Sequence, residues 1–146
     1  MTRVCQVILL FLSWVFLTAM GAIGDSGPIS APVPPMNFAA TITDRSDLAT
    51  VVENFSIEGK TSISGRLGSG RISIGFEKIA SIGFVLQGED LRADVALKEG
   101  DKVSVVVDKG MACYGKLPYG DIQIAVEEIR AITIHGEVTE KAIEGN

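Results

Sequence analysis

Two stretches of this chain match each other along their whole length. Residues Phe55–Phe84 align with Val105–Ile134 at an offset of 50, without gaps, and eight of the 30 aligned positions are identical. The identities are glycines, a glutamate and apolar residues: Gly65/Gly115, Leu67/Leu117, Gly70/Gly120, Ile72/Ile122, Ile74/Ile124, Glu77/Glu127, Ile79/Ile129 and Ile82/Ile132. Because a shared backbone needs the same turn glycines and the same buried face, we expect two copies of one structural unit.

Within each copy, apolar residues recur at every second position. Ile72, Ile74 and Phe76 alternate with polar or small residues, which is typical of a β-strand with one buried face. The same alternation, with Gly-containing turns between the runs, predicts ten strands. They are expected at residues 37–43, 55–58, 62–67, 71–76, 82–86, 92–97, 103–108, 111–117, 121–126 and 131–138.

Little helix is expected. Only residues 46–54 and the short stretches 76–80 and 126–130 are compatible with helical turns. Each copy then contains a strand, a hairpin, a strand, one helical turn and a final strand, an order that resembles small SH3-like barrels. The resemblance implies an all-β fold, a small antiparallel barrel or sandwich built from two SH3-like β repeats. Because about 50 residues bury too little surface alone, we expect one fused structure rather than two separate barrels.

The first 24 residues have the pattern of a signal peptide. Arg3 precedes an apolar run from Val7 to Ala22, and small residues stand at positions 19, 21, 22 and 24, where a signal peptidase cleaves. An uncleaved anchor is the alternative, because residues 4–23 are just long enough to span a bilayer core of about 30 Å. The cleaved form predicts a periplasmic or secreted protein.

Residues 25–35 hold four of the five prolines, so we predict a Pro-rich linker between the signal peptide and the folded domain. The β domain is expected to occupy residues 36–146, with internal repeats at 55–84 and 105–134. Cys5 lies in the signal peptide, which leaves Cys113 alone in the mature chain, without an intramolecular disulfide. We interpret Cys113 as a small buried apolar residue; the alternative is a thiol that pairs between chains.

The net charge of −5 excludes several classes of partner. A negative surface repels nucleic acid and anionic lipid, so we expect no nucleic acid and, after signal cleavage, no membrane as partner. We predict no catalytic residue, because His135 is the only histidine and has no nucleophile with it in a motif. No cofactor or metal is predicted either, since the spacings of haem, zinc and calcium motifs do not occur.

Two pairs of residues are candidates for ligand binding. Arg66 and Arg71 flank the glycines of residues 65–71, where they would meet an anion, although a hairpin turn explains this stretch better. Tyr114 and Tyr119 flank the second hairpin and are candidates for an exposed aromatic patch, or for ordinary packing.

These patterns favour an exported, non-enzymatic β domain that acts as a binding or assembly module of the cell envelope, with another envelope protein as its partner. The alternatives are a subunit of a larger envelope complex, and an enzyme with an unrecognised carboxylate site. The sequence does not distinguish among oligomeric states or identify the ligand.

Overall fold

The computed structural model describes residues 28–139, which fold into ten antiparallel strands and two 3-10 turns. The predicted signal peptide and residues 25–27 and 140–146 lie outside the described residues. The elements are β1 (Phe38–Asp44), β2 (Ala49–Ile57), β3 (Ser62–Leu67), β4 (Gly70–Gly75), η2 (Phe76–Lys78), β5 (Ile79–Gln87), β6 (Asp90–Leu97), β7 (Lys102–Val107), β8 (Ala112–Leu117), β9 (Gly120–Ala125), η3 (Val126–Glu128) and β10 (Ile129–Glu137).

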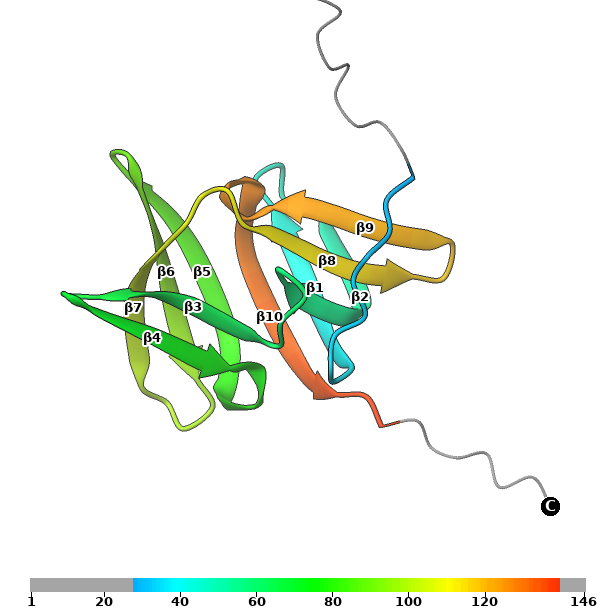
Figure 1. Ribbon diagram of the computed structural model, residues 1–146, viewed down its shortest axis with the longest axis horizontal. Helices are drawn as coiled ribbons and strands as arrows, with labels where there is room; N and C mark the ends of the chain where they lie inside the picture. The colour runs from blue at the N-terminus through cyan, green and yellow to red at the C-terminus, as the bar shows by residue number, and fades with distance from the viewer. Residues whose placement is uncertain (1–27, 140–146) are drawn as a thin grey trace, which may run out of the picture.

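All ten strands belong to one continuous sheet, which curls into a half-barrel (Figure 1). The strand order is β4-β3-β7-β6-β5-β10-β1-β2-β8-β9, so β4 and β9 are its edges and β5 and β10 lie at its centre. The prediction of an all-β fold is therefore confirmed.

The expected helical turns at 76–80 and 126–130 are confirmed as η2 and η3, but the one at 46–54 is wrong. Most of that stretch belongs to β2, which pairs with β1 on one side and β8 on the other, so the sheet satisfies its backbone hydrogen bonds. Asn54 takes a φ of 48°, and the register of β2 shifts between Glu53 and Ser56. This irregularity breaks the alternation of side chains by which a strand is recognised.

The strand order stays the same when the two halves of the chain are exchanged. The exchange replaces β1 by β6, β2 by β7 and so on, and each of β6–β10 by the strand whose number is five lower. Applied to the strand order, it gives the same order read in reverse. The β3–β4 hairpin consequently extends the sheet from β7, and the β8–β9 hairpin extends it from β2. Each half of the chain thus contributes its hairpin to the strands of the other half.

The pairing registers follow the same exchange, with one difference. Leu67 pairs with Gly70 as Leu117 pairs with Gly120, an offset of 50. Ala40 pairs with Val52, whereas Ala93 pairs with Val105, an offset of 53. The pairing registers thus follow an offset of 50 in the two hairpins and an offset of 53 in the strands before them. The additional residues lie between the middle of β2 and the start of β3, where Asn54 of β2 and residues 58 and 59 of the β2–β3 connection have positive φ angles.

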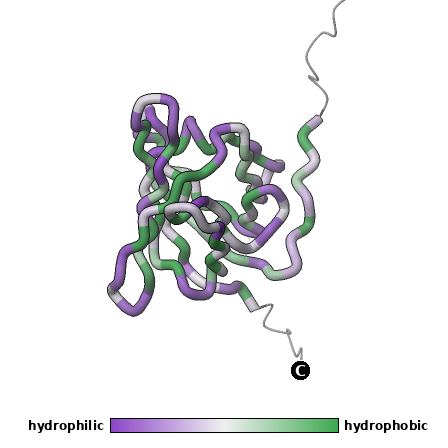
Figure 2. Tube along the Cα trace, turned by 60° about the vertical axis from the view of Figure 1, so that its left-hand side comes forward, coloured by the Kyte–Doolittle hydropathy of each residue, from purple (hydrophilic) through white to green (hydrophobic). Residues whose placement is uncertain are grey.

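A single hydrophobic core lies inside the curled sheet, while the turns at its periphery are mostly hydrophilic (Figure 2). Phe76 of η2 packs edge-on against Phe38, with ring centroids 5.6 Å apart, and stacks on Phe55 at 5.1 Å. Cys113 is fully buried, which confirms its interpretation as an apolar core residue. Because all three rings and Cys113 join one cluster, the two halves share a core.

Candidate functional site

An open groove of about 520 Å³ lies beside β3, β4 and β7. Among the side chains that line it are three cations and three carboxylates, namely Lys60, Arg66, Arg71, Glu58, Asp90 and Asp108. Both arginines predicted as ligand candidates are therefore in the groove. The remaining walls come from the β2–β3 connection and from the end of β7. The β2–β3 connection directly precedes β3, whereas the end of β7 is distant from the arginines in sequence. No local motif indicates either wall.

Strand alternation directs the two arginines to the outer side of the sheet. Ile63 is buried on the inner face of β3, so the side chains of Ser64 and Arg66 point outward. Arg66 pairs in register with Arg71 on β4 and with Val106 on β7. The two arginines thus stand directly opposite each other across one pair of strands, and both are exposed.

Gly65 allows β3 to approach β7 closely. A Cβ atom there would lie 2.7 Å from the carbonyl oxygen of Val106. Gly115 has the same role on β8, where a Cβ would lie 2.6 Å from the side chain of Val52. Van der Waals contact does not permit either distance, which explains the identity of these two positions.

The stretch from Gly65 to Arg71 is a hairpin and not a phosphate-binding loop. Leu67 pairs with Gly70, and Gly68 in the turn between them has a φ of 61°. The equivalent turn of β8–β9 begins with Pro118, whose ring fixes a negative φ, so the two turns differ in conformation. The arginine side chains, rather than the backbone of this stretch, are therefore the groups available to a ligand.

The two candidate tyrosines do not line the groove. Tyr119 lies at the tip of the β8–β9 hairpin with 85% of its surface exposed. Tyr114 is half-buried within β8, opposite Ser56 and Gln123. Only Tyr119 therefore offers its ring freely to a partner.

The other end of the sheet is covered by the chain itself. Residues 28–36, which we call the strap, cross the β8–β9 hairpin before β1 begins (Figure 1). The backbone N–H of Ala31 donates a hydrogen bond to Asp121 Oδ2 at 3.0 Å. Pro34 is buried, and Pro32 lies beside Gly59. The described end of the predicted linker is therefore packed on the domain.

Two side chains that could act in catalysis are those of His135 and Cys113, and both lie in surroundings typical of structural residues. His135 is exposed, and its Nε2 lies 2.6 Å from Thr41 Oγ1. Burial, together with the charge of Glu58, raises the pKa of the Cys113 thiol far above its usual value, which suppresses the nucleophilic thiolate. Within residues 28–139, no cluster of three or more His, Cys, Asp or Glu residues is arranged to hold a metal ion.

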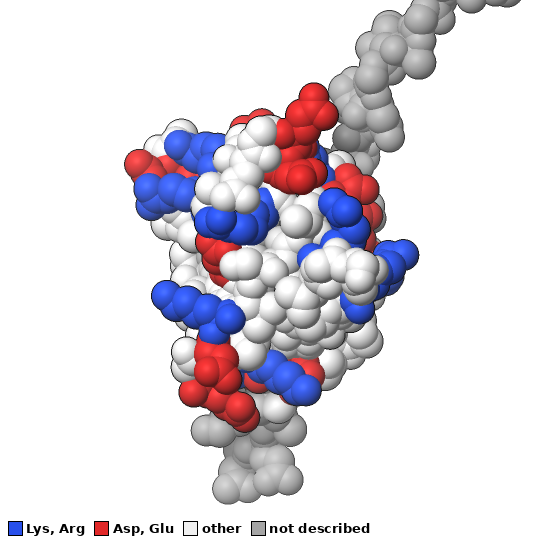
Figure 3. Space-filling view, turned by 90° about the vertical axis from the view of Figure 1, so that its left-hand side faces the viewer, with Lys and Arg blue, Asp and Glu red and all other residues white. Residues whose placement is uncertain are grey.

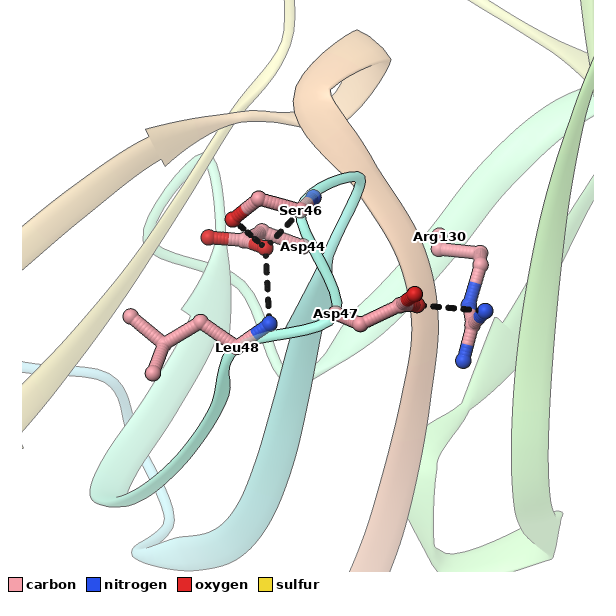
Figure 4. Close-up of polar contacts among 5 residues, drawn as sticks. All are labelled: Asp44, Ser46, Asp47, Leu48 and Arg130. Atoms are coloured by element: carbon pink, nitrogen blue, oxygen red, sulfur yellow. Dashed lines mark hydrogen bonds and ion pairs between the residues drawn. The ribbon is translucent and has the colours of Figure 1, made fainter.

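The turn between β1 and β2 is held by a local network (Figure 4). One oxygen of the Asp44 carboxylate accepts hydrogen bonds from the hydroxyl and N–H of Ser46 and from the N–H of Leu48. The Ser46 hydroxyl and the Leu48 N–H are the main causes that lower the pKa of Asp44. Asp47, with a φ of 68°, forms an ion pair with Arg130. The network shapes the turn and lies outside the groove.

Comparison with known proteins places the chain in a family but gives it no function. A family model described as "Uncharacterised protein" matches residues 35–137, which include every strand of the sheet. Neither the curated proteins nor the solved structures contain a match to the chain. In the described part of the chain, no helix has the length and apolar character needed to cross a membrane. Since the family model covers more than half of its residues, the chain belongs to this family of uncharacterised proteins.

Proposed function

We propose that this protein is an exported, non-enzymatic binding or assembly module of the cell envelope, and that its groove is the docking surface. The observation that carries the proposal is the position of Arg66 and Arg71, two exposed cations that face each other on the wall of a groove. Their guanidinium groups are suited to recognising an anionic group on a partner.

The edge of the sheet beside the groove supports this proposal. Among the described strands, β4 pairs with β3 alone, which leaves the backbone groups of its other edge unpaired. Such an edge can accept an extended segment of a partner as an additional strand. A partner in the groove would then meet side-chain and backbone donors together.

We also infer that the domain arose by duplication of an SH3-like unit, followed by exchange of hairpins. Three features support this origin: the symmetric strand order, the equal registers of the β3–β4 and β8–β9 hairpins, and the two glycines at close strand contacts. A duplicated domain offers two equivalent surfaces, which can diverge in use while the core stays fixed.

Export is the third element of the proposal. It rests on the sequence of residues 1–24, with Arg3, the apolar run and the small residues after it. Delivery to the periplasm or the exterior would place the groove among envelope proteins. A subunit of a larger envelope complex would use the same surface for permanent assembly.

The proposal is tested by capture from the native envelope. The full chain with a C-terminal tag is expressed in its own host as wild type, as Arg66→Ala/Arg71→Ala, and as Lys116→Ala. Lys116 is the control because it holds the position equivalent to Arg66 on the strap-covered hairpin. We expect a partner that wild type and Lys116→Ala retain and that the double variant loses. Equal capture by all three proteins would contradict docking in the groove.

A further inference from the structure

We infer that the groove binds an extended peptide segment that carries a carboxylate, in the way that the other end of the sheet binds the chain's own strap. This inference rests on the proposed function and specifies the chemistry of the partner.

The strap shows how this fold holds an extended segment. On the covered side, formed by β10, β1, β2, β8 and β9, the strap lies against Asp121 of β9 and Gly59 of the β2–β3 connection. On the groove side, formed by β5, β6, β7, β3 and β4, the equivalent positions are Arg71 and the β7–β8 connection. Arg71 and residues 108 and 111 of that connection line the groove. The groove is thus the counterpart of the surface under the strap.

The groove side has no strap of its own. The strap is the segment that precedes β1. The strand equivalent to β1 on the groove side is β6, and β6 is preceded by the tight turn from β5 at Gly88. That turn continues the central sheet, because Gln87 pairs with Asp90 on each side of it. Within residues 28–139, no segment equivalent to the strap crosses β3–β4 (Figure 1). The surface is therefore formed by the same fold, and the described part of the chain leaves it uncovered.

The covered side and the groove side carry different charges, and this difference determines which ligand the groove binds. On the covered side the outward cross-strand pair is Lys116 with Asp121, which have opposite charges, and Asp121 binds a strap N–H. On the groove side the pair is Arg66 with Arg71. Like charges directly opposite each other destabilise a sheet, and an anion between them removes this repulsion. A segment with a carboxylate at this point supplies that anion.

None of the described acidic residues of the groove, Asp90 included, forms an ion pair with these arginines. The Asp108 carboxylate accepts a hydrogen bond from the N–H of Gly110, and the Glu58 carboxylate accepts one from the N–H of Ala112. The ion pairs within residues 28–139 are Arg92–Asp94 and Arg130–Asp47, and neither includes a groove arginine. Figure 3 views the side of the molecule where β4, β6 and β7 lie, and shows both signs of charge interspersed around uncharged surface. Specificity for an acidic segment thus arises locally at the arginine pair.

The test uses three labelled peptides and the purified full chain. The neutral peptide copies residues 28–36, the acidic peptide carries Ala31→Glu, and the basic peptide carries Ala31→Lys. Fluorescence anisotropy measures the dissociation constants, and a photo-crosslinker on each peptide locates the contact by mass spectrometry. The protein is studied as wild type, Arg71→Asp and Lys116→Ala, with circular dichroism to verify that each variant is folded.

We expect the acidic peptide to bind wild type at least about tenfold more tightly than the basic peptide, and to crosslink to β3, β4 or β7. Arg71→Asp should reverse this preference, while Lys116→Ala should leave it unchanged. Equal binding of the three peptides, or crosslinks confined to β8–β9, would overturn the inference. The proposed module would survive that result if the arginine-dependent capture from the envelope still occurred, so the two failures are distinguishable.

Discussion

Ile82 and Ile132 are paired with each other at the centre of the sheet, and both are completely buried. The flanking pairs are Ala131 with Gly83 and Thr133 with Ser81, so the pairing is symmetric about the two isoleucines. These are the pairs by which β5 and β10 join the two sides of the sheet. The pair of isoleucines therefore lies at the centre of the symmetric strand order.

This relationship predicts equal costs for equivalent substitutions. Ile82→Ala and Ile132→Ala should each lower the free energy of unfolding by about 2–5 kcal/mol, because each leaves a cavity in the core. Because the side chains are paired neighbours, the double variant should deviate from additivity by about 0.5–3 kcal/mol. Urea denaturation measures all three values. A cost below 1 kcal/mol for one isoleucine alone would show that the two positions are not equivalent.

The close strand contacts predict which glycines tolerate a methyl group. Gly65→Ala should destabilise the protein by about 1–3 kcal/mol, because the new Cβ would lie 2.7 Å from the Val106 carbonyl oxygen. Gly83→Ala is the matched control, since Gly83 is also in a strand but a Cβ there meets nothing within 4 Å. Thermal unfolding followed by circular dichroism should show a lower midpoint for Gly65→Ala only. Equal midpoints would mean that β3 and β7 are further apart than described.

Two aspartates predict a loss of stability in acid. The Ser104 hydroxyl, followed by Arg92, lowers the pKa of Asp94, and hydrogen bonds from Ser46 and Leu48 lower the pKa of Asp44. Because the folded-state pKa values lie below the unfolded ones, this stabilisation is complete above the unfolded pKa of about 3.9 and disappears as the pH falls through the folded values. Asp44→Asn should weaken the pH dependence of the urea midpoint below pH 4. Glu99→Gln, in an exposed turn, should leave it unchanged.

Export predicts the first residue of the mature protein. Mass spectrometry of the chain isolated from its native host should find an N-terminus near Ala22 or Asp25, because the small residues before these positions fit a signal peptidase. An intact chain beginning at Met1 and recovered in the membrane fraction would favour the anchor instead. The strap begins after both cleavage positions, so either product retains its contact with Asp121.

Local patterns predicted most of the strands but not their arrangement. Alternation of Ile63, Gly65 and Leu67 located β3 to the residue, whereas the predicted strand 55–58 covers only the end of β2, because the irregularity at Asn54 breaks the alternation. Period-two alternation indicates which face of a strand is buried, but it does not indicate which other strand pairs with it. The exchange of hairpins could not be predicted for this reason, since β3 finds its partner β7 across a long sequence separation.

The sequence also predicted part of the candidate site, namely its two arginines, but not the rest. Arg66 and Arg71 stood out because two cations flank a glycine hairpin, and both line the groove. The wall formed by Val106 and Asp108 depends on the hairpin exchange, so it was not accessible from the sequence. The strap contact is equally non-local, because Asp121 lies 90 residues from Ala31.

The hairpin exchange underlies both the shared core and the groove, and one crosslinking measurement tests it directly. Arg66 pairs with Val106 of β7, whereas Lys116, its equivalent, pairs with Glu53 of β2. Without exchange, Arg66 would therefore face Glu53. In a Cys113→Ala background, Arg66→Cys/Val106→Cys should form a disulfide on mild oxidation, because Cα atoms of paired residues lie within the range of about 4.4–6.8 Å that a disulfide requires. Arg66→Cys/Glu53→Cys should remain reduced. The opposite result, a disulfide between positions 66 and 53 and none between 66 and 106, would contradict the exchange.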